Sequence, residues 1–170
     1  MKKVFFLAAL LVCSIAAQAQ RFALVDMEYI LKQIPAYEQA NQQMESLSKQ
    51  WQSEVEAKAQ EAKTMYDEYQ KNASNWSATQ KTTQENAIIA KEKEAADLRK
   101  KYFGPEGEGM KKRQELITPI QDAIYNAIKD IATQKNYDAV IDRASAQSMI
   151  FASPRIDISN EVLAKLGYSN

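Results

Sequence analysis

The chain has 170 residues, of which 22 are basic and 22 acidic, so its formal net charge is zero and nothing in this balance indicates nucleic-acid binding. It contains no histidine and one cysteine, Cys13, which removes the commonest general base and metal ligand and leaves no disulfide to form within the chain. No P-loop motif is present, so we do not expect a nucleotide-driven function.

Residues 1–19 have the pattern of an export signal. A charged start precedes an apolar run that is too short to cross a bilayer, and the segment ends in the small-x-small site Ala-Gln-Ala. Lipidation at Cys13 is the alternative, but Val12 stands where a lipoprotein signal prefers a small residue. We therefore expect cleavage after Ala19 and export of the remaining chain.

The mature chain is predicted to begin with a strand and a short helix. The apolar run at 22–25, ended by Asp26, shows no alternation, which favours a strand at about 22–26 that is buried on both faces. Asp26 can cap a helix at 27–33, and Pro35 suits the first turn of the helix that follows.

A long helix is predicted from residue 36 to residue 71. This stretch has no glycine or proline and is rich in strong helix formers. At about 1.5 Å per residue it would be roughly 54 Å long. Its apolar residues recur at helical spacing in a stripe wide enough for one partner helix. The stripe consists of Met44, Leu47, Trp51, Val55, Ala59, Ala62, Tyr66 and Tyr69.

Polar turn formers at about 72–77 predict the tip of a hairpin, with Ser74 or Ser77 capping the returning helix. Trp76 either folds back on the arm or stands free as a contact residue. The returning helix is expected to run from about residue 78 to residue 102 and to face the first one. Its seam residues are Ala87, Ile88, Ala95, Leu98 and Tyr102.

Residues 103–109 interrupt the returning helix. They hold three of the four glycines and one of the four prolines, so an ordinary α-helix cannot continue through them. Helical composition resumes at Met110, and we therefore expect a hinge or a bulge inside an arm that extends over 36–119. The glycine spacing resembles a phosphate loop only superficially, because no strand precedes it.

A dense apolar stripe between residues 116 and 131 predicts a helix buried in a core. Pro119 lies inside this helix and removes one of its hydrogen bonds. We expect either a kink near 115–119 or a new helical segment capped by Thr118.

The last part of the chain is predicted to contain two strands and a helix. The strands are expected at about 137–142 and 148–152, separated by a turn. The helix is expected at 158–166, with Asp157 as its cap and Gly167 closing it.

These segments predict an α+β fold in which a long antiparallel helical hairpin is attached to a small β-containing body. The body, at 20–35 and 120–170, has about 67 residues and no disulfide, so its core is marginal. Its strands would also leave sheet edges unpaired, so we expect oligomerisation through the body. The candidate residues are Phe22, Leu24, Val140, Ile141, Ile150 and Phe151.

The order of these segments resembles the Skp/OmpH family of periplasmic chaperones over essentially the whole mature chain. The resemblance is carried by Phe-Ala-Leu-Val-Asp-Met at 22–27, Tyr-Asp-Ala-Val-Ile-Asp at 137–142 and Asp-Ile-Ser-Asn-Glu-Val-Leu at 157–163. The Lys-Lys-Tyr-Phe-Gly-Pro-Glu-Gly block at 100–107, followed by Lys-Arg-Gln-Glu-Leu-Ile at 112–117, is similar to a Bacteroidetes-type branch.

The resemblance implies a periplasmic homotrimer in which three hairpins enclose a cavity. Such a protein would bind unfolded outer-membrane proteins and prevent their aggregation without ATP, cofactor or catalysis. A structural envelope scaffold, or an adaptor for one folded partner, is the alternative. We also consider peripheral contact with a membrane surface. The best-known members are strongly basic, whereas this mature chain has 20 basic and 22 acidic residues. The resemblance therefore does not extend to lipopolysaccharide binding.

Two groups of arm residues are candidates for contact with an unfolded client. Met65 is adjacent to Tyr66, and Phe103 to Tyr102, so one member of each pair must face away from the hairpin seam. The apolar candidates are Met65, Tyr69, Trp76, Tyr102 and Phe103. The basic candidates, for contact with a client or with a membrane surface, are Lys100, Lys101, Lys111, Lys112 and Arg113.

Overall fold

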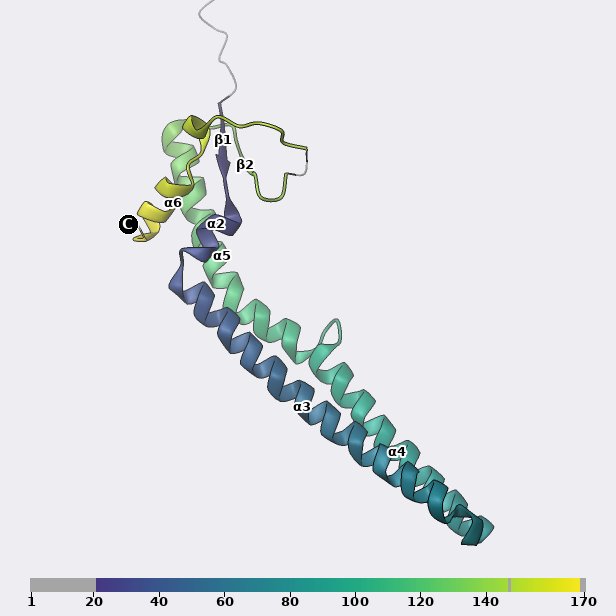
Figure 1. Cartoon of the computed structure of the whole chain (residues 1–170). Helices are drawn as coiled ribbons and strands as arrows, with labels where there is room; N and C mark the ends of the chain where they lie inside the picture. The colour runs from purple at the N-terminus through teal and green to yellow at the C-terminus, as the bar shows by residue number, and fades with distance from the viewer. Residues whose placement is uncertain (1–20, 147, 169–170) are drawn as a thin grey trace, which may run out of the picture. The chain divides into compact units, whose positions relative to one another are not determined.

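The computed structural model describes residues 21–146 and 148–168, which are mostly helical (Figure 1). They form two compact units: the arm, Pro35–Asp122, and the body, which comprises the described residues up to Ile34 and from Ala123. The export signal lies outside the described residues, so cleavage after Ala19 stays a prediction. Among the helices of the described part, none is both long and apolar enough to cross a membrane.

The body contains a two-stranded parallel sheet. Strand β1 (Phe22–Val25) pairs with β2 (Ala139–Asp142), with Phe22 opposite Ala139. Parallel neighbours need a long crossover connection, and here that connection contains the whole arm. As the apolar run predicts, β1 is buried from Ala23 to Val25.

The strand predicted at 148–152 is wrong. Residues 148–153 form a turn and irregular structure in the described chain. The second edge of β1 is instead approached by Asp157, which makes an isolated parallel bridge with Leu24. Ile158 N–H also donates to the Leu24 carbonyl at 2.9 Å. This edge of β1 is therefore occupied by residues 157–158, and the 148–153 segment pairs with neither strand of the sheet.

Short helices complete the body, and their ends follow local signals. Asp26 caps α2 (Met27–Lys32) by accepting a 2.8 Å hydrogen bond from the Tyr29 amide. The last helix, α6 (Ser159–Leu166), has Ile158 at its N-cap position, so the predicted start is one residue early. Asp157 still accepts from the Ser159 amide at 2.9 Å.

The end of α6 matches the predicted glycine cap. Gly167 has a φ of 85°, a left-handed conformation that is favourable for glycine. The core between the helices and the sheet is apolar. It includes Ala23, Leu24, Val25, Ile30, Ile34, Ile124, Ala127, Ile131, Ile158, Val162 and Leu163.

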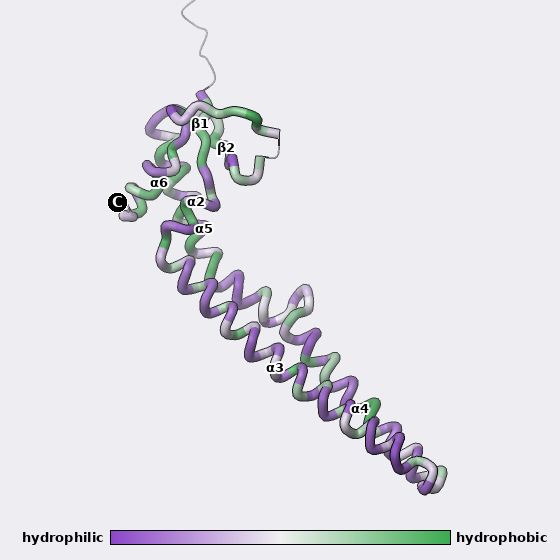
Figure 2. Tube along the Cα trace, viewed as in Figure 1, coloured by the Kyte–Doolittle hydropathy of each residue, from purple (hydrophilic) through white to green (hydrophobic). Residues whose placement is uncertain are grey.

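The arm is an antiparallel pair of helices, α3 (Pro35–Asn72) and α4 (Ala78–Phe103). Tyr102 at the end of α4 contacts Glu54, whereas Glu85 near its start contacts Tyr69 near the end of α3. At the tip, Ser77 forms a capping box with Gln80, which selects Ser77 over Ser74 as the cap. Figure 2 shows that both helices are mainly hydrophilic, with hydrophobic residues at intervals.

The apolar stripe of α3 is confirmed in part. The buried seam residues are Trp51, Val55 and Ala62 of α3 and Ile88, Ala95 and Tyr102 of α4. Tyr66 is 48% exposed and Ala59 is also exposed, so the predicted seam is wrong at these two positions. Met65 is half-buried beside the seam, where its flexible unbranched side chain packs well. The Tyr66 hydroxyl remains outside and accepts a hydrogen bond from Gln70 at 2.9 Å.

Helix α5 (Glu108–Lys135) begins in the arm and ends in the body. It continues through Pro119, so a new segment capped by Thr118 is not formed. Pro119 is exposed, and water can therefore satisfy the Glu115 carbonyl that a proline leaves without an amide donor.

Candidate functional site

An aromatic cluster lies where α4 ends. The rings of Trp51 and Tyr102 stack with their centroids 5.1 Å apart and their planes at 10°. Phe103 meets Trp51 edge-on, at 6.3 Å and 84°. Trp51 and Tyr102 are buried, whereas Phe103 is 44% exposed. The adjacent residues 102 and 103 thus divide as predicted, with Tyr102 in the seam and Phe103 outside it.

The Tyr102 hydroxyl donates a 2.6 Å hydrogen bond to Glu54 Oε2 across the seam. This bond, followed by one from Gln50, lowers the pKa of the Glu54 carboxyl below its ordinary value. The same bond raises the pKa of the Tyr102 hydroxyl. At neutral pH the pair is therefore a charged acceptor with a protonated donor, which is a strong form of hydrogen bond.

The interruption between α4 and α5 is a hydrogen-bonded bulge. Gly104 N–H donates to the Lys100 carbonyl at 2.9 Å, and Gly107 N–H donates to the Gly104 carbonyl at 2.9 Å. A Cβ at position 107 would lie only 2.8 Å from the Lys101 carbonyl oxygen and 2.9 Å from that of Tyr102. Glycine is therefore required here for close backbone approach. A hinge role for this segment stays a prediction.

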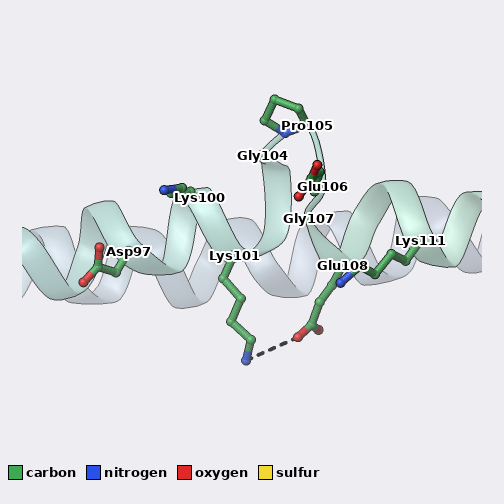
Figure 3. A pocket seen from close by; sticks show the side chains of 9 residues that line it. All are labelled: Asp97, Lys100, Lys101, Gly104, Pro105, Glu106, Gly107, Glu108 and Lys111. Atoms are coloured by element: carbon green, nitrogen blue, oxygen red, sulfur yellow. Dashed lines mark ion pairs between the residues drawn. The ribbon is translucent and has the colours of Figure 1, made fainter.

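Two hollows flank the bulge. The first, here called the loop hollow, has a volume of about 670 Å³ and is shown in Figure 3. It has charges of both signs, and Lys101 pairs with Glu108 there at 3.5 Å. Its lining consists of Asp97, Lys100, Lys101, Gly104, Pro105, Glu106, Gly107, Glu108 and Lys111.

The second hollow, here called the seam groove, has a volume of about 560 Å³. It lies between α3 and α4, and its lining includes three alanines, two cations and no acidic residue. The lining consists of Val55, Ala59, Ala95, Ala96, Arg99, Lys100, Phe103 and Gly104. Arg99 is not among the predicted contact residues. The space beside it depends on the register between the helices, which the sequence does not state.

The predicted apolar contact residues have different environments. Tyr102 is wrong as a contact residue because it is buried inside the hairpin. Met65 is half-buried. The Tyr69 hydroxyl donates a hydrogen bond to Glu85, and its ring meets that of Trp76 edge-on with the centroids 5.8 Å apart. Trp76 thus lies back on the arm, and Phe103 is the most exposed of the five predicted residues.

The predicted basic contact residues are also not equivalent. Lys101 pairs with Glu108, and Lys112 pairs with Glu115 at 2.9 Å. Within residues 21–146 and 148–168, the other three have no ion-pair partner. These are Lys100, Lys111 and Arg113.

The predicted oligomerisation residues lie in the body. Leu24 is buried within its own chain, so it is wrong as an intermolecular contact. Ile150 is fully exposed and Phe151 is 83% exposed. Phe22 and Ile141 are also exposed, while Val140 is half-buried. Other exposed apolar residues that the sequence interpretation misses include Tyr125 and Ile156 of the body and Ile89 and Met110 of the arm.

Comparisons with known proteins agree with this architecture. A family model described as outer membrane protein (OmpH-like) matches residues 21–166. A protein from Yersinia enterocolitica named chaperone protein Skp is 29% identical over 92% of both chains. Proteins of the same name from Photorhabdus laumondii and Photorhabdus luminescens are 28% and 30% identical, over 90% and 75% of both chains respectively.

Proposed function

The chain belongs to the OmpH-like outer membrane protein family, and from that premise we propose that it is an ATP-independent periplasmic chaperone. It binds unfolded outer-membrane proteins and prevents their aggregation during transit. The similar proteins are named as chaperones, and their matches cover most of this chain. The proposed activity is holding, without catalysis or a cofactor.

The arm is the observation that carries this proposal. Its narrow apolar seam is buried between α3 and α4, and the rest of the arm surface is exposed and can make other contacts. That surface is mostly polar but exposes single apolar side chains. These are Tyr66, Ile89, Phe103 and Met110. Scattered apolar contacts favour weak, adaptable binding of an unfolded chain over recognition of one folded surface.

Aggregation of a denatured outer-membrane β-barrel tests the activity. The barrel protein is diluted from urea, and light scattering is followed with and without the mature chain from residue 20. We expect an equimolar amount of oligomer to suppress scattering. No suppression at several-fold excess would reject the holding function. A scaffold or adaptor would instead capture one folded partner in a pull-down.

We further propose that the body joins three copies of the chain. Within the described residues, β2 has β1 as its one strand neighbour, which leaves its other edge available. Ile141 of β2 and the exposed pair Ile150 and Phe151 supply apolar surface in the body. Multi-angle light scattering should give the mass of a trimer. Phe151→Asp should lower this mass, whereas Tyr125→Asp, at another exposed aromatic residue, should not.

A further inference from the structure

The floor of the seam groove is made by small side chains. Ala59 of α3 and Ala95 and Ala96 of α4 leave open a space that larger residues would fill, and Val55 is almost completely buried beside them. The volume of about 560 Å³ is in the usual range of ligand sites. The α4 residues that line it span 95–103, or about 12 Å of helix. That length corresponds to roughly four residues of extended polypeptide.

One wall of the seam groove is an aromatic ring held in place. Phe103 meets Trp51 edge-on at 6.3 Å and Tyr102 edge-on at 6.5 Å, and both of these rings are buried. The exposed part of Phe103 is therefore a positioned apolar surface. Another aromatic side chain can pack against it edge-on or offset, which are the arrangements that such rings prefer.

The rim of the seam groove carries positive charge without a partner. Arg99 and Lys100 line it, and neither side chain forms an ion pair or hydrogen bond with another residue of the described ranges 21–146 and 148–168. Asp97 lines the loop hollow, as Lys100 also does, but it does not line the seam groove. Elsewhere on the arm, by contrast, Lys91 is held by Glu94 at 2.9 Å and by Glu61 at 3.4 Å. The seam groove therefore has two cations and no acidic residue in its lining, beside an apolar floor.

We propose that the seam groove binds short segments of unfolded polypeptide in which an aromatic side chain has an acidic neighbour. The ring lies over the alanine floor against Phe103, and the carboxylate meets the Arg99 guanidinium and the Lys100 ammonium. Arginine suits this task because its planar fork can bind a carboxylate through two hydrogen bonds. The inference rests on the proposed holding function and names the client segment that the arm prefers. Several arms in one oligomer would combine such weak contacts into retention of a longer chain.

Fluorescence anisotropy with the full mature chain tests this assignment. The probe is a fluorescein-labelled Gly-Ser peptide with a central Asp-Phe-Asp; two matched peptides carry Lys-Phe-Lys or Asp-Ala-Asp. We expect the first peptide to bind about tenfold more tightly than either control peptide. Ala96→Leu fills the groove and should weaken its binding by about tenfold. Ala90→Leu, at an exposed α4 position outside the groove, should leave binding unchanged.

Charge variants test the rim separately. Arg99→Gln should weaken binding of the Asp-Phe-Asp peptide. Binding of the Asp-Ala-Asp peptide is already weak and should not fall further. Lys93→Gln, which removes an exposed α4 cation outside the groove, should change neither. Circular dichroism melting checks the fold of each variant. If Ala96→Leu does not fold, Ala59→Leu fills the groove from the opposite helix.

Several results would overturn the inference. Equal binding of the three peptides, or wild-type affinity in a folded groove-filled variant, rejects the site. Displacement of the peptide by vesicles containing phosphatidylglycerol, but not by excess unlabelled peptide, would assign the groove to a lipid surface. The aggregation assay separates this inference from the proposed function. If the wild-type chain suppresses aggregation but binds all three peptides equally, only the groove assignment is rejected. If it does not suppress aggregation, the proposed function itself is rejected.

Discussion

Replacing Trp51 by alanine should destabilise the arm more than any single change on its exposed surface. Trp51 is 8% exposed, and its ring stacks on Tyr102 and meets Phe103 edge-on. The truncation also removes packing beside Gly109 at the start of α5, where an added Cβ would lie 3.4 Å from the Trp51 ring. It leaves the hydrogen bond from Tyr102 to Glu54 without its neighbouring ring.

The magnitude follows from the area that is lost. About 150 Å² of apolar surface at about 25 cal/mol per Å² gives roughly 4 kcal/mol. Truncation of a core tryptophan typically costs about 3–5 kcal/mol. A two-helix arm can close partly around the cavity, so we expect the lower end, about 3 kcal/mol. That free energy corresponds to roughly a hundredfold increase in the opening equilibrium of the arm.

Native-state hydrogen exchange measures this opening residue by residue. Amides of α3 and α4 near the cluster should exchange roughly a hundredfold faster in Trp51→Ala, up to the limit set by the free energy of local opening. Tyr66→Ala is the matched control, because this aromatic side chain lies on the same helix but is half exposed. It should change exchange severalfold at most. Equal acceleration in the two variants would refute the view that the cluster holds the arm together.

Three further outcomes are expected. Tyr102→Phe should raise the pKa of the Glu54 carboxyl toward its ordinary value, as measured by NMR titration, because the hydroxyl is the main cause of its depression. Since that pKa is depressed in the folded state, the stabilisation is present above the unfolded-state pKa and is lost as pH falls through the folded-state pKa; an unchanged titration in the variant would contradict this. Gly167→Ala should lower the free energy of unfolding in urea by about 1 kcal/mol, because φ is 85° there. An added Cβ meets nothing within 4 Å, so this cost comes from the backbone conformation alone, and Gly167→Asn should cost less. Gly107→Ala should accelerate hydrogen exchange around the bulge, since its Cβ would lie 2.8 Å from a carbonyl oxygen; unchanged protection would show that the loop shifts freely.

Helix ends and the hairpin turn could be predicted because their causes are local. Each of these helix ends depends on one residue that caps, begins or closes the helix through neighbours within a few positions. The structure confirms four such residues: Asp26, Pro35, Ser77 and Gly167. The interruption at 103–109 could be located for the same reason. Whether it forms a bulge or a hinge could not, because the close approach of Gly107 to the preceding turn appears only once the chain has folded.

Strands and faces were harder because they depend on partners. The 148–152 segment has strand composition, but a strand forms only where a partner edge pairs with it, and in the described chain Asp157 bridges to β1 in its place. Tyr66 and Met65 differ by one helical position, and packing places the methionine nearer the seam. The seam groove forms because Ala59 of α3 lies beside Ala95 and Ala96 of α4, which depends on how the two helices pair. The sequence does not state that pairing, so it did not indicate Arg99 as a contact residue.

In the sequence, the arm is inserted between the two parallel strands β1 and β2, so its length can be changed without changing the sheet. The register of β1 and β2 is continued at both ends by backbone bonds from Asp138 to Arg21 and from Arg143 to Val25, and none of these residues lies in the arm. Equal stretches could therefore be excised from α3 and α4 on either side of the turn, while the Ser77 cap is retained. Shorter or longer versions of one scaffold would then measure how reach determines the size of the cargo that is sheltered.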